Sequence, residues 1–205
     1  MALELFSRGG PIMWPLLLCS VVALAISLER FFFLRRVHVN GEKLMRAVNA
    51  CLARGNPAEA KGICEATPGP VAKVLAAALA HPELSKADIR DSVRAVALGE
   101  IPVLERYLPS LGTVVTISPL LGLLGTISGL MKVFNVIAGG QIGNYTQLSV
   151  GISEALITTF AGLAIAIPFL VVYNGLSSRV DSLVNEMEQR VAELLARRTD
   201  GGESR

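Results

Sequence analysis

The sequence predicts an all-α integral membrane protein with three transmembrane helices, long helical cytoplasmic extensions, an outer N-terminus and a cytoplasmic C-terminus. Of the 205 residues, 52% are hydrophobic and only 18% are charged, whereas about a quarter of a soluble domain is charged. Three apolar segments, 11–34, 108–137 and 148–176, are longer than the roughly 20 residues with which a helix crosses a bilayer. Elsewhere helix-capping and Ala-rich patterns recur, and no segment has the alternation of a strand.

The distribution of basic residues predicts the orientation of the chain. Segment 35–107 contains eleven Lys and Arg residues and segment 177–205 contains five, whereas segment 138–147 has no charged residue. Basic residues near the ends of spans stay in the cytoplasm. We therefore expect 35–107 and 177–205 to be cytoplasmic, 138–147 to be a short outer loop, and 1–10 to be an arm on the outer side.

The cytoplasmic segment 35–107 is expected to be helical. Gly and Pro residues separate its first helices, which we expect at 41–54, 57–66 and 71–80. Ser85 and Asp88 then form a capping signal, from which a helical pattern continues into the second span. Three prolines should each bend or break this long helix: Pro102, Pro109 and Pro119.

The segment after the third span, 177–205, is expected to form an amphipathic cytoplasmic helix and a polar tail. Its apolar residues recur at helical spacing: Val180, Leu183, Val184, Met187, Val191, Leu194 and Leu195. A helix that projects from the membrane with such a stripe needs a partner, and we expect self-association to provide one.

Small residues mark the second and third spans as surfaces where helices meet. Gly125 and Gly129 fit the small-xxx-small pattern of close helix approach, and the helical period places Gly122, Thr126 and Val133 on the same face as Gly129 and Pro119. In the third span the corresponding face comprises Ile152, Ala155, Thr159, Gly162 and Ala166. The candidate packing and hinge residues are Pro119, Gly122, Gly125, Gly129, Gly162 and Pro168.

Three polar residues in the spans are candidates for an ion path: Thr126, Thr159 and Glu154. Hydroxyls and acids in membrane helices occur mainly where helices meet or line a polar path. A threonine can also satisfy its hydroxyl on the preceding turn of its own helix, and Glu154 can be an interface-paired acid. Lys132, near the outer end of the second span, is the candidate partner for Glu154.

Other site chemistries lack support in the sequence. The three cysteines and two histidines show no metal-ligand spacing, and basic and aromatic residues do not alternate as in nucleic-acid-binding surfaces. We therefore expect no metal, no cofactor, no nucleic-acid partner and no enzymatic activity. A solute transporter is disfavoured because the three spans show no inverted repeat.

At 119–129 (PLLGLLGTISG) and 151–168 (GISEALITTFAGLAIAIP), the chain resembles the MotA/TolQ/ExbB family of ion-channel motor subunits, most closely its TolQ/ExbB branch. The resemblance implies a homopentamer in the bacterial inner membrane, with the second and third spans around a central pore. It also implies a partner, an ExbD/TolR-like single-span protein whose membrane Asp has no counterpart in this chain and is the principal proton carrier.

The resemblance also implies roles for single residues. Thr126 and Thr159 match the threonines of the family's second and third spans. Glu154 and Pro168 match its third-span acid and proline, whereas Lys132 stands where relatives are usually less charged. The expected function is therefore the pore-forming subunit of a motor driven by the proton-motive force, which energises envelope or outer-membrane transport. A passive membrane scaffold that anchors a partner is the alternative, and the choice between H⁺ and Na⁺ and the energised process stay open.

Overall fold

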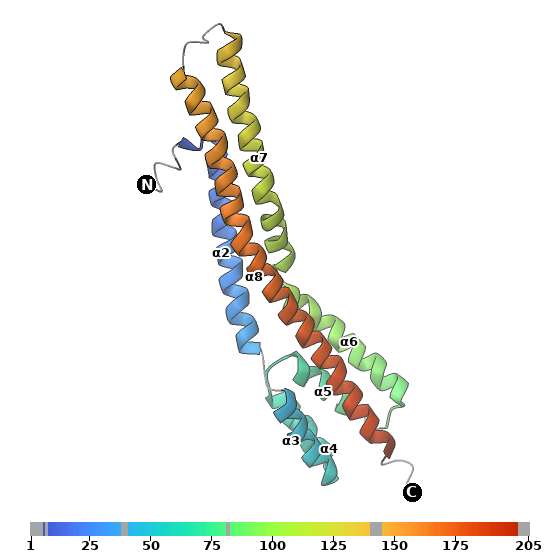
Figure 1. The fold of residues 1–205 in the computed structure, drawn as a ribbon. Helices are drawn as coiled ribbons and strands as arrows, with labels where there is room; N and C mark the ends of the chain where they lie inside the picture. The colour runs from blue at the N-terminus through green and yellow to red at the C-terminus, as the bar shows by residue number, and fades with distance from the viewer. Residues whose placement is uncertain (1–5, 7, 38–40, 81–82, 140–144, 201–205) are drawn as a thin grey trace. The chain divides into compact units, whose positions relative to one another are not determined.

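The structure is a computed structural model that describes residues 6, 8–37, 41–80, 83–139 and 145–200 (Figure 1). The regular elements among these residues are helices, which confirms the all-α prediction. They are α2 (Met13–Val37), α3 (Gly41–Ala53), α4 (Pro57–Ala66), α5 (Pro70–Ala80), α6 (Lys86–Glu105), α7 (Leu108–Ala138) and α8 (Tyr145–Asp200). The described residues leave out 201–205 of the predicted tail, 140–144 of the predicted outer loop 138–147, and most of the predicted arm at 1–10.

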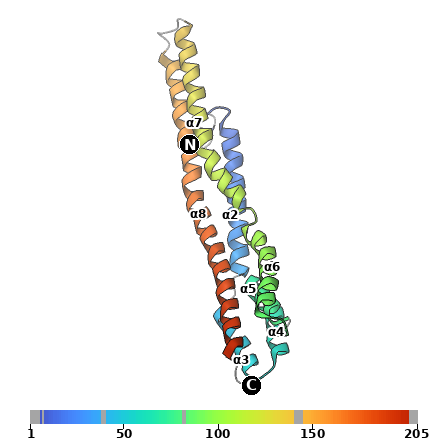
Figure 2. The ribbon, with the colours of Figure 1, turned by 90° about the vertical axis from the view of Figure 1, so that its right-hand side faces the viewer.

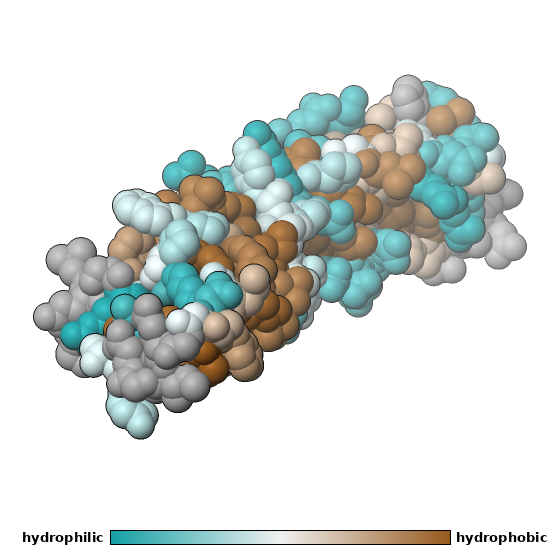
Figure 3. All heavy atoms as spheres, turned by 90° about the horizontal axis from the view of Figure 1, so that it is seen from above, coloured by the Kyte–Doolittle hydropathy of each residue, from teal (hydrophilic) through white to brown (hydrophobic). Residues whose placement is uncertain are grey.

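Three helical stretches of the described chain are long and apolar enough to cross a membrane, as the sequence predicted. These stretches include α2, α7 and α8. Their large side chains are exposed along much of their length, for example Phe134 at 66% and Phe160 at 70%. Figure 3 shows apolar side chains gathered on the surface of the protein. Such a surface requires an apolar environment.

Contacts divide the chain into two units. The first comprises Met1–Arg30 and Tyr107–Gly175, and the second comprises Phe31–Arg106 and Leu176–Arg205. Helices α2 and α8 each contribute residues to both units.

In the first unit, α7 and α8 lie side by side and run in opposite directions (Figures 1 and 2). Helix α7 begins after Tyr107, which has a φ of 66° and ends the preceding helical stretch. The side chain of Arg30 on α2 is 2% exposed, and its guanidinium lies 5.5 Å from the centre of the Tyr107 ring. A cation over an aromatic face is stabilising, and more so where water is excluded.

The three prolines do not act alike. Pro109 lies in the first turn of α7, where its missing N–H has no intrahelical acceptor and costs nothing. Pro102 and Pro119 lie inside α6 and α7 and end neither helix. The break in the predicted long helix is therefore at Arg106 and Tyr107, where the backbone leaves helical geometry.

In the second unit, α3, α4, α5 and α6 form a core with the end of α8. The Ser85 hydroxyl accepts a hydrogen bond from the Asp88 N–H at 3.2 Å, which confirms the predicted cap of α6. The predicted stripe on α8 is mostly covered by the chain itself, because Val180, Leu183, Met187, Val191, Leu194 and Leu195 are buried. This corrects the expectation that the stripe is covered by a second copy of the chain. The sequence shows that the stripe is apolar, but not that helices of the same chain fold back over it.

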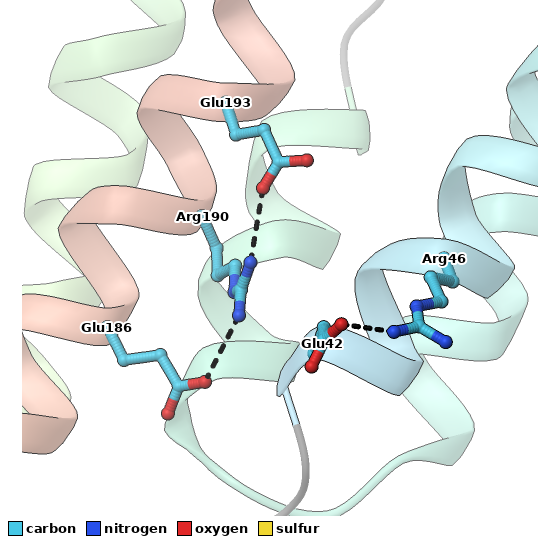
Figure 4. Close-up of polar contacts among 5 residues, drawn as sticks. All are labelled: Glu42, Arg46, Glu186, Arg190 and Glu193. Carbon is cyan, nitrogen blue, oxygen red and sulfur yellow. Dashed lines mark hydrogen bonds and ion pairs between the residues drawn. The ribbon is translucent and has the colours of Figure 1, made fainter.

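Ion pairs accompany this core where α8 approaches the start of α3 (Figure 4). Arg190 on α8 lies 3.2 Å from Glu193 and 3.9 Å from Glu186. A Cβ on Gly41, the first residue of α3, would lie 2.2 Å from a Glu186 oxygen. The start of α3 therefore lies directly against the Glu186 side chain of α8.

Candidate functional site

Glycines bring α7 and α8 into backbone contact. A Cβ on Gly125 would lie 2.2 Å from Thr158 Oγ1, and one on Gly129 would lie 2.7 Å from the Gly151 carbonyl oxygen. A Cβ on Gly162 would lie 2.6 Å from the Ser118 carbonyl oxygen. These distances are too short for any real side chain, so the interface depends on small residues, as in other membrane helix pairs.

The buried line of each helix is rotated relative to the face that the sequence predicted. On α7 it runs through Ser118, Gly122, Gly125, Gly129 and Val133, so Pro119 and Thr126 lie at its edge.

On α8 the buried line includes Thr158, which is 1% exposed, whereas Ile152 is 44% exposed and Pro168 is also exposed. Ile152 is therefore not part of the interface. A helical period gives the residues that share a face but not the rotation of that face toward a neighbour.

Thr126 and Thr159 meet across the interface. Their hydroxyls are hydrogen-bonded to each other. The Thr159 hydroxyl also lies 3.2 Å from the carbonyl oxygens of Gly122 and Ala155, and the Thr126 hydroxyl lies 3.4 Å from the same two oxygens. The two residues predicted to line a path thus form one cluster, which we call the hydroxyl pair.

The hydroxyl pair differs from the neighbouring Thr158. Thr158 is buried, and its hydroxyl donates to the carbonyls of Glu154 and Ala155 at 3.0 Å, within its own helix. Both members of the hydroxyl pair are half-buried. They combine bonds to their own helix with bonds across the interface, and they lie partly exposed at its edge.

Glu154 forms an ion pair with Lys132. Lys132 Nζ lies 2.6 Å and 2.7 Å from the two carboxylate oxygens of Glu154, and the side chains are 51% and 11% exposed, respectively. This confirms the suggested pairing. A carboxylate at such a site needs a partner, because an uncompensated buried charge is strongly destabilising.

The N-terminal turn at Gly9 and Gly10 covers Glu154, which the sequence did not predict. Gly10 has a φ of +69°, and a Cβ there would lie 2.0 Å from Glu154 Oε1. Next to it, a Cβ on Gly9 would lie 3.2 Å from Ile157 Cγ2. The adjacent glycines at positions 9 and 10 were the available signal, because glycine is the residue that accepts this backbone conformation without strain.

The hydroxyl pair and the ion pair lie on opposite edges of the same interface. At 3.6 residues per turn, Thr126 and Lys132 fall on either side of the line through Gly122, Gly125 and Gly129. Glu154 and Thr159 flank the buried line of α8 in the same way. The N-terminal turn covers the ion-pair edge.

Comparison with known proteins places these elements in a family. The sequence model of the MotA/TolQ/ExbB proton channel family matches residues 66–189, which contain the hydroxyl pair, the ion pair and the small-residue interface.

Individual relatives agree with this match. The chain is 32% identical over 195 residues to the biopolymer transport protein ExbB-like 3 of Synechocystis, with 93% of this chain and 92% of that protein aligned. It is 29% identical over 187 residues to an ExbB homologue of Methanothermobacter thermautotrophicus, aligning 91% of this chain with 66% of that protein. It is 40% identical over 106 residues to the Tol-Pal system protein TolQ of Haemophilus influenzae, aligning 50% of this chain with 46% of that protein.

Proposed function

Because this chain belongs to the MotA/TolQ/ExbB proton channel family, we propose that it is the pore-forming subunit of a motor complex driven by the proton-motive force. The complex energises envelope or outer-membrane transport through an ExbD/TolR-like single-span partner. The subunit is a homopentamer in the bacterial inner membrane, with its N-terminus outside and its C-terminus in the cytoplasm. We assign no enzymatic reaction to this chain.

The hydroxyl pair is the observation that carries this proposal. Two threonines from antiparallel helices meet in an otherwise apolar span, and both are half-buried. A hydroxyl donates one hydrogen bond and accepts two, and it carries no charge at physiological pH. Thr126 and Thr159 therefore solvate a partner carboxyl in its protonated and ionised forms without trapping the ion.

The driving force is adequate for mechanical work. Each proton that crosses is driven by about 2.3 kcal/mol per 100 mV of membrane potential. In the proposed mechanism the partner Asp exchanges its proton between the two sides while it faces successive hydroxyl pairs of the ring. The partner helices move as a result and transmit force to the envelope.

Glu154 has a supporting place in this mechanism. Its ion pair with Lys132 makes it a fixed charge at the edge opposite the hydroxyl pair. We therefore propose that the partner Asp carries the proton and that the hydroxyl pair solvates it. Glu154 contributes a charge at the outer end of the path.

Replacement of the hydroxyls by methyl groups tests the proposal. Thr→Val keeps the shape of the side chain and removes its hydrogen bonding. We expect Thr126→Val and Thr159→Val to lower proton flux about tenfold or more in proteoliposomes that contain the complex with its partner, because a hydrogen bond to a charged group contributes about 1.5–3 kcal/mol. Co-purification and native mass spectrometry of the same samples should show unchanged assembly and five copies of the chain.

Thr116→Val is the matched control. Thr116 lies on the same helix and is exposed, and its hydroxyl bonds to the Gly112 carbonyl of the preceding turn at 2.9 Å. Its replacement should leave the flux unchanged. Full flux in the Thr126→Val, Thr159→Val double variant would contradict the pore-lining role and favour the passive scaffold.

A further inference from the structure

The α7–α8 interface is built mostly from small residues. Its central residues on α7 are Gly122, Gly125 and Gly129, and they face Gly151 and Gly162 on α8. Large side chains that fit between the residues of a partner helix normally prevent sliding and rotation. Here the knobs are few and small, because Thr158 packs against Gly125 and Val133 packs against Gly151, so polar contacts at the edges add to the steric contacts that set the register.

Polar contacts cross this interface at both of its edges, and the contact at one edge is ionic. The hydroxyl pair lies at one edge, and Lys132 and Glu154 lie at the other. Along the axis the two contacts are about 9 Å apart on α7 and about 7.5 Å apart on α8, at 1.5 Å per residue. Contacts at two heights and on two edges fix both the sliding and the rotation of one helix against the other.

We propose that Lys132 is a positioning residue that acts through Glu154 to hold Thr126 opposite Thr159. Lys132 Nζ contacts both carboxylate oxygens, at 2.6 Å and 2.7 Å, so the ammonium is centred on the carboxylate rather than attached at one side. A charge-assisted contact of this kind is about twice as strong as a neutral hydrogen bond. It therefore adds a strong constraint on the register to the bonds of the threonine hydroxyls, at another height and on the other edge of the interface.

The N-terminal turn makes this contact more effective. Gly10 packs directly on Glu154 Oε1 and shields the carboxylate, whose side chain is 11% exposed. Exclusion of water strengthens an ion pair and removes the alternative partners of the carboxylate. Glu154 is thus held from two sides, by Lys132 of α7 and by the turn before α2.

The functional meaning of this positioning rests on the proposed function, but its geometry does not. A disulfide forms only when two cysteines lie at the right distance and orientation. The rate at which Thr126→Cys and Thr159→Cys crosslink therefore measures the register directly, without a partner protein and without proton flux.

The test uses the full chain in native membranes, with Cys19, Cys51 and Cys64 replaced by Ala. We expect Thr126→Cys, Thr159→Cys to form an intramolecular disulfide rapidly with a mild oxidant. Adding Lys132→Met should slow the reaction about fivefold, which corresponds to a weakening of the contact by roughly 1 kcal/mol. Lys132→Arg, which keeps the charge, should restore the rate.

The exchange Lys132→Glu, Glu154→Lys should also restore the rate, because it rebuilds the ion pair in reverse. If Lys132→Met does not accumulate, Lys132→Met, Glu154→Met leaves no buried charge and should still show slow crosslinking. Thermal unfolding of each variant in detergent reports on folding elsewhere. The melting temperature of every variant at position 132 should stay well above the temperature of the crosslinking reaction.

Equal crosslinking of Thr126→Cys, Thr159→Cys with and without Lys132 would overturn the proposal, and so would a loss of crosslinking that neither Arg nor the charge exchange restores. Slow crosslinking with unchanged proton flux would support the positioning role and contradict the proposed role of the hydroxyls. The two proposals can therefore fail separately.

Discussion

Glycines of α8 differ in what surrounds them, and this difference decides how α7 and α8 meet. A Cβ on Gly162 would lie 2.6 Å from the Ser118 carbonyl oxygen and 3.2 Å from Gly122 Cα, both of which are backbone atoms. Backbone atoms cannot rotate away as a side chain does. At Gly175 of the same helix, a Cβ would have no heavy atom of the described residues within 4 Å, apart from its own helix backbone and chain neighbours.

We predict that Gly162→Ala destabilises the first unit by about 1–3 kcal/mol, the usual cost of overpacking. Gly175→Ala should be neutral or stabilising by up to about 1 kcal/mol, because Ala favours an open helical position. Thermal unfolding in detergent measures both effects. Equal melting temperatures of the two variants would contradict the close approach at Gly162.

The Cys64 thiol provides a second prediction at this scale. Burial raises the pKa of Cys64 to about 11, and the thiolate is the reactive form of cysteine. Alkylation of Cys64 in the folded protein should therefore be very slow at pH 7.5 and should accelerate as the pH rises toward 11. The rate at pH 7.5 should rise sharply in denaturant, where the thiol is exposed. Mass spectrometry of the modified peptide measures the alkylation rate. Fast labelling of Cys64 in the native protein at neutral pH would contradict its burial.

The residues of the site were predicted more completely than their arrangement. Residue type and helical period identified Thr126, Thr159 and Glu154, and the first two do meet. The burial of Thr158 was not predicted, because the rotation of a helix about its axis depends on its neighbour. The cover of Gly10 over Glu154 was also not predicted, since it depends on a contact between residues far apart in the sequence.

At the scale of the element, α8 combines two surfaces in one helix. Its first half has the small residues that approach α7. Its last part, from Leu176, has side chains such as Val180 and Met187 that belong to the core of the second unit, where each is 2% exposed. Burying a side chain of this size contributes about 1.5–3 kcal/mol, so the stripe stabilises the fold of the individual chain.

We predict that Met187→Ala lowers the stability of the second unit by about 2–5 kcal/mol, the usual cost of emptying a buried Met site. Asn185→Ala, at an exposed position of the same helix, should change it by less than about 0.5 kcal/mol. Denaturant unfolding at several protein concentrations distinguishes packing of Met187 within one chain from packing against a second copy. A loss that disappears at high concentration would show that Met187 packs against a second copy instead.

Local signals predicted the helices of the second unit well. Ser85 caps α6 by accepting from the Asp88 N–H, as predicted, and Asn56 caps α4 through the Glu59 N–H, a cap that was not predicted. Such caps are readable because they involve residues three positions apart. The break at Tyr107 could not be predicted from the sequence. The nearby prolines are stronger signals for a helix break, and a positive φ at a tyrosine is uncommon.

At the scale of the whole molecule, the positive charges and the exposed apolar surfaces belong to different parts of the sequence. Segment 35–107 carries eleven basic residues and segment 138–147 carries no charge, which favours a cytoplasmic location for the former. The native cysteines cannot report on this orientation. Cys51 and Cys64 are each 1% exposed, so they would resist labelling on either side of a membrane.

Cysteines introduced at exposed positions give a decisive test of topology. Tyr145, at the start of α8, is 80% exposed, and Ala58 in α4 is also exposed. With the N-terminus outside and the C-terminus in the cytoplasm, a membrane-impermeant maleimide should label Tyr145→Cys in spheroplasts but not Ala58→Cys. Permeabilisation should make Ala58→Cys react as fast as Tyr145→Cys, which confirms that its thiol is accessible. The opposite labelling pattern would show that the protein has the inverted orientation in the membrane. It would then place the Lys132–Glu154 pair at the cytoplasmic end of the path and reverse the direction in which protons meet the hydroxyl pair.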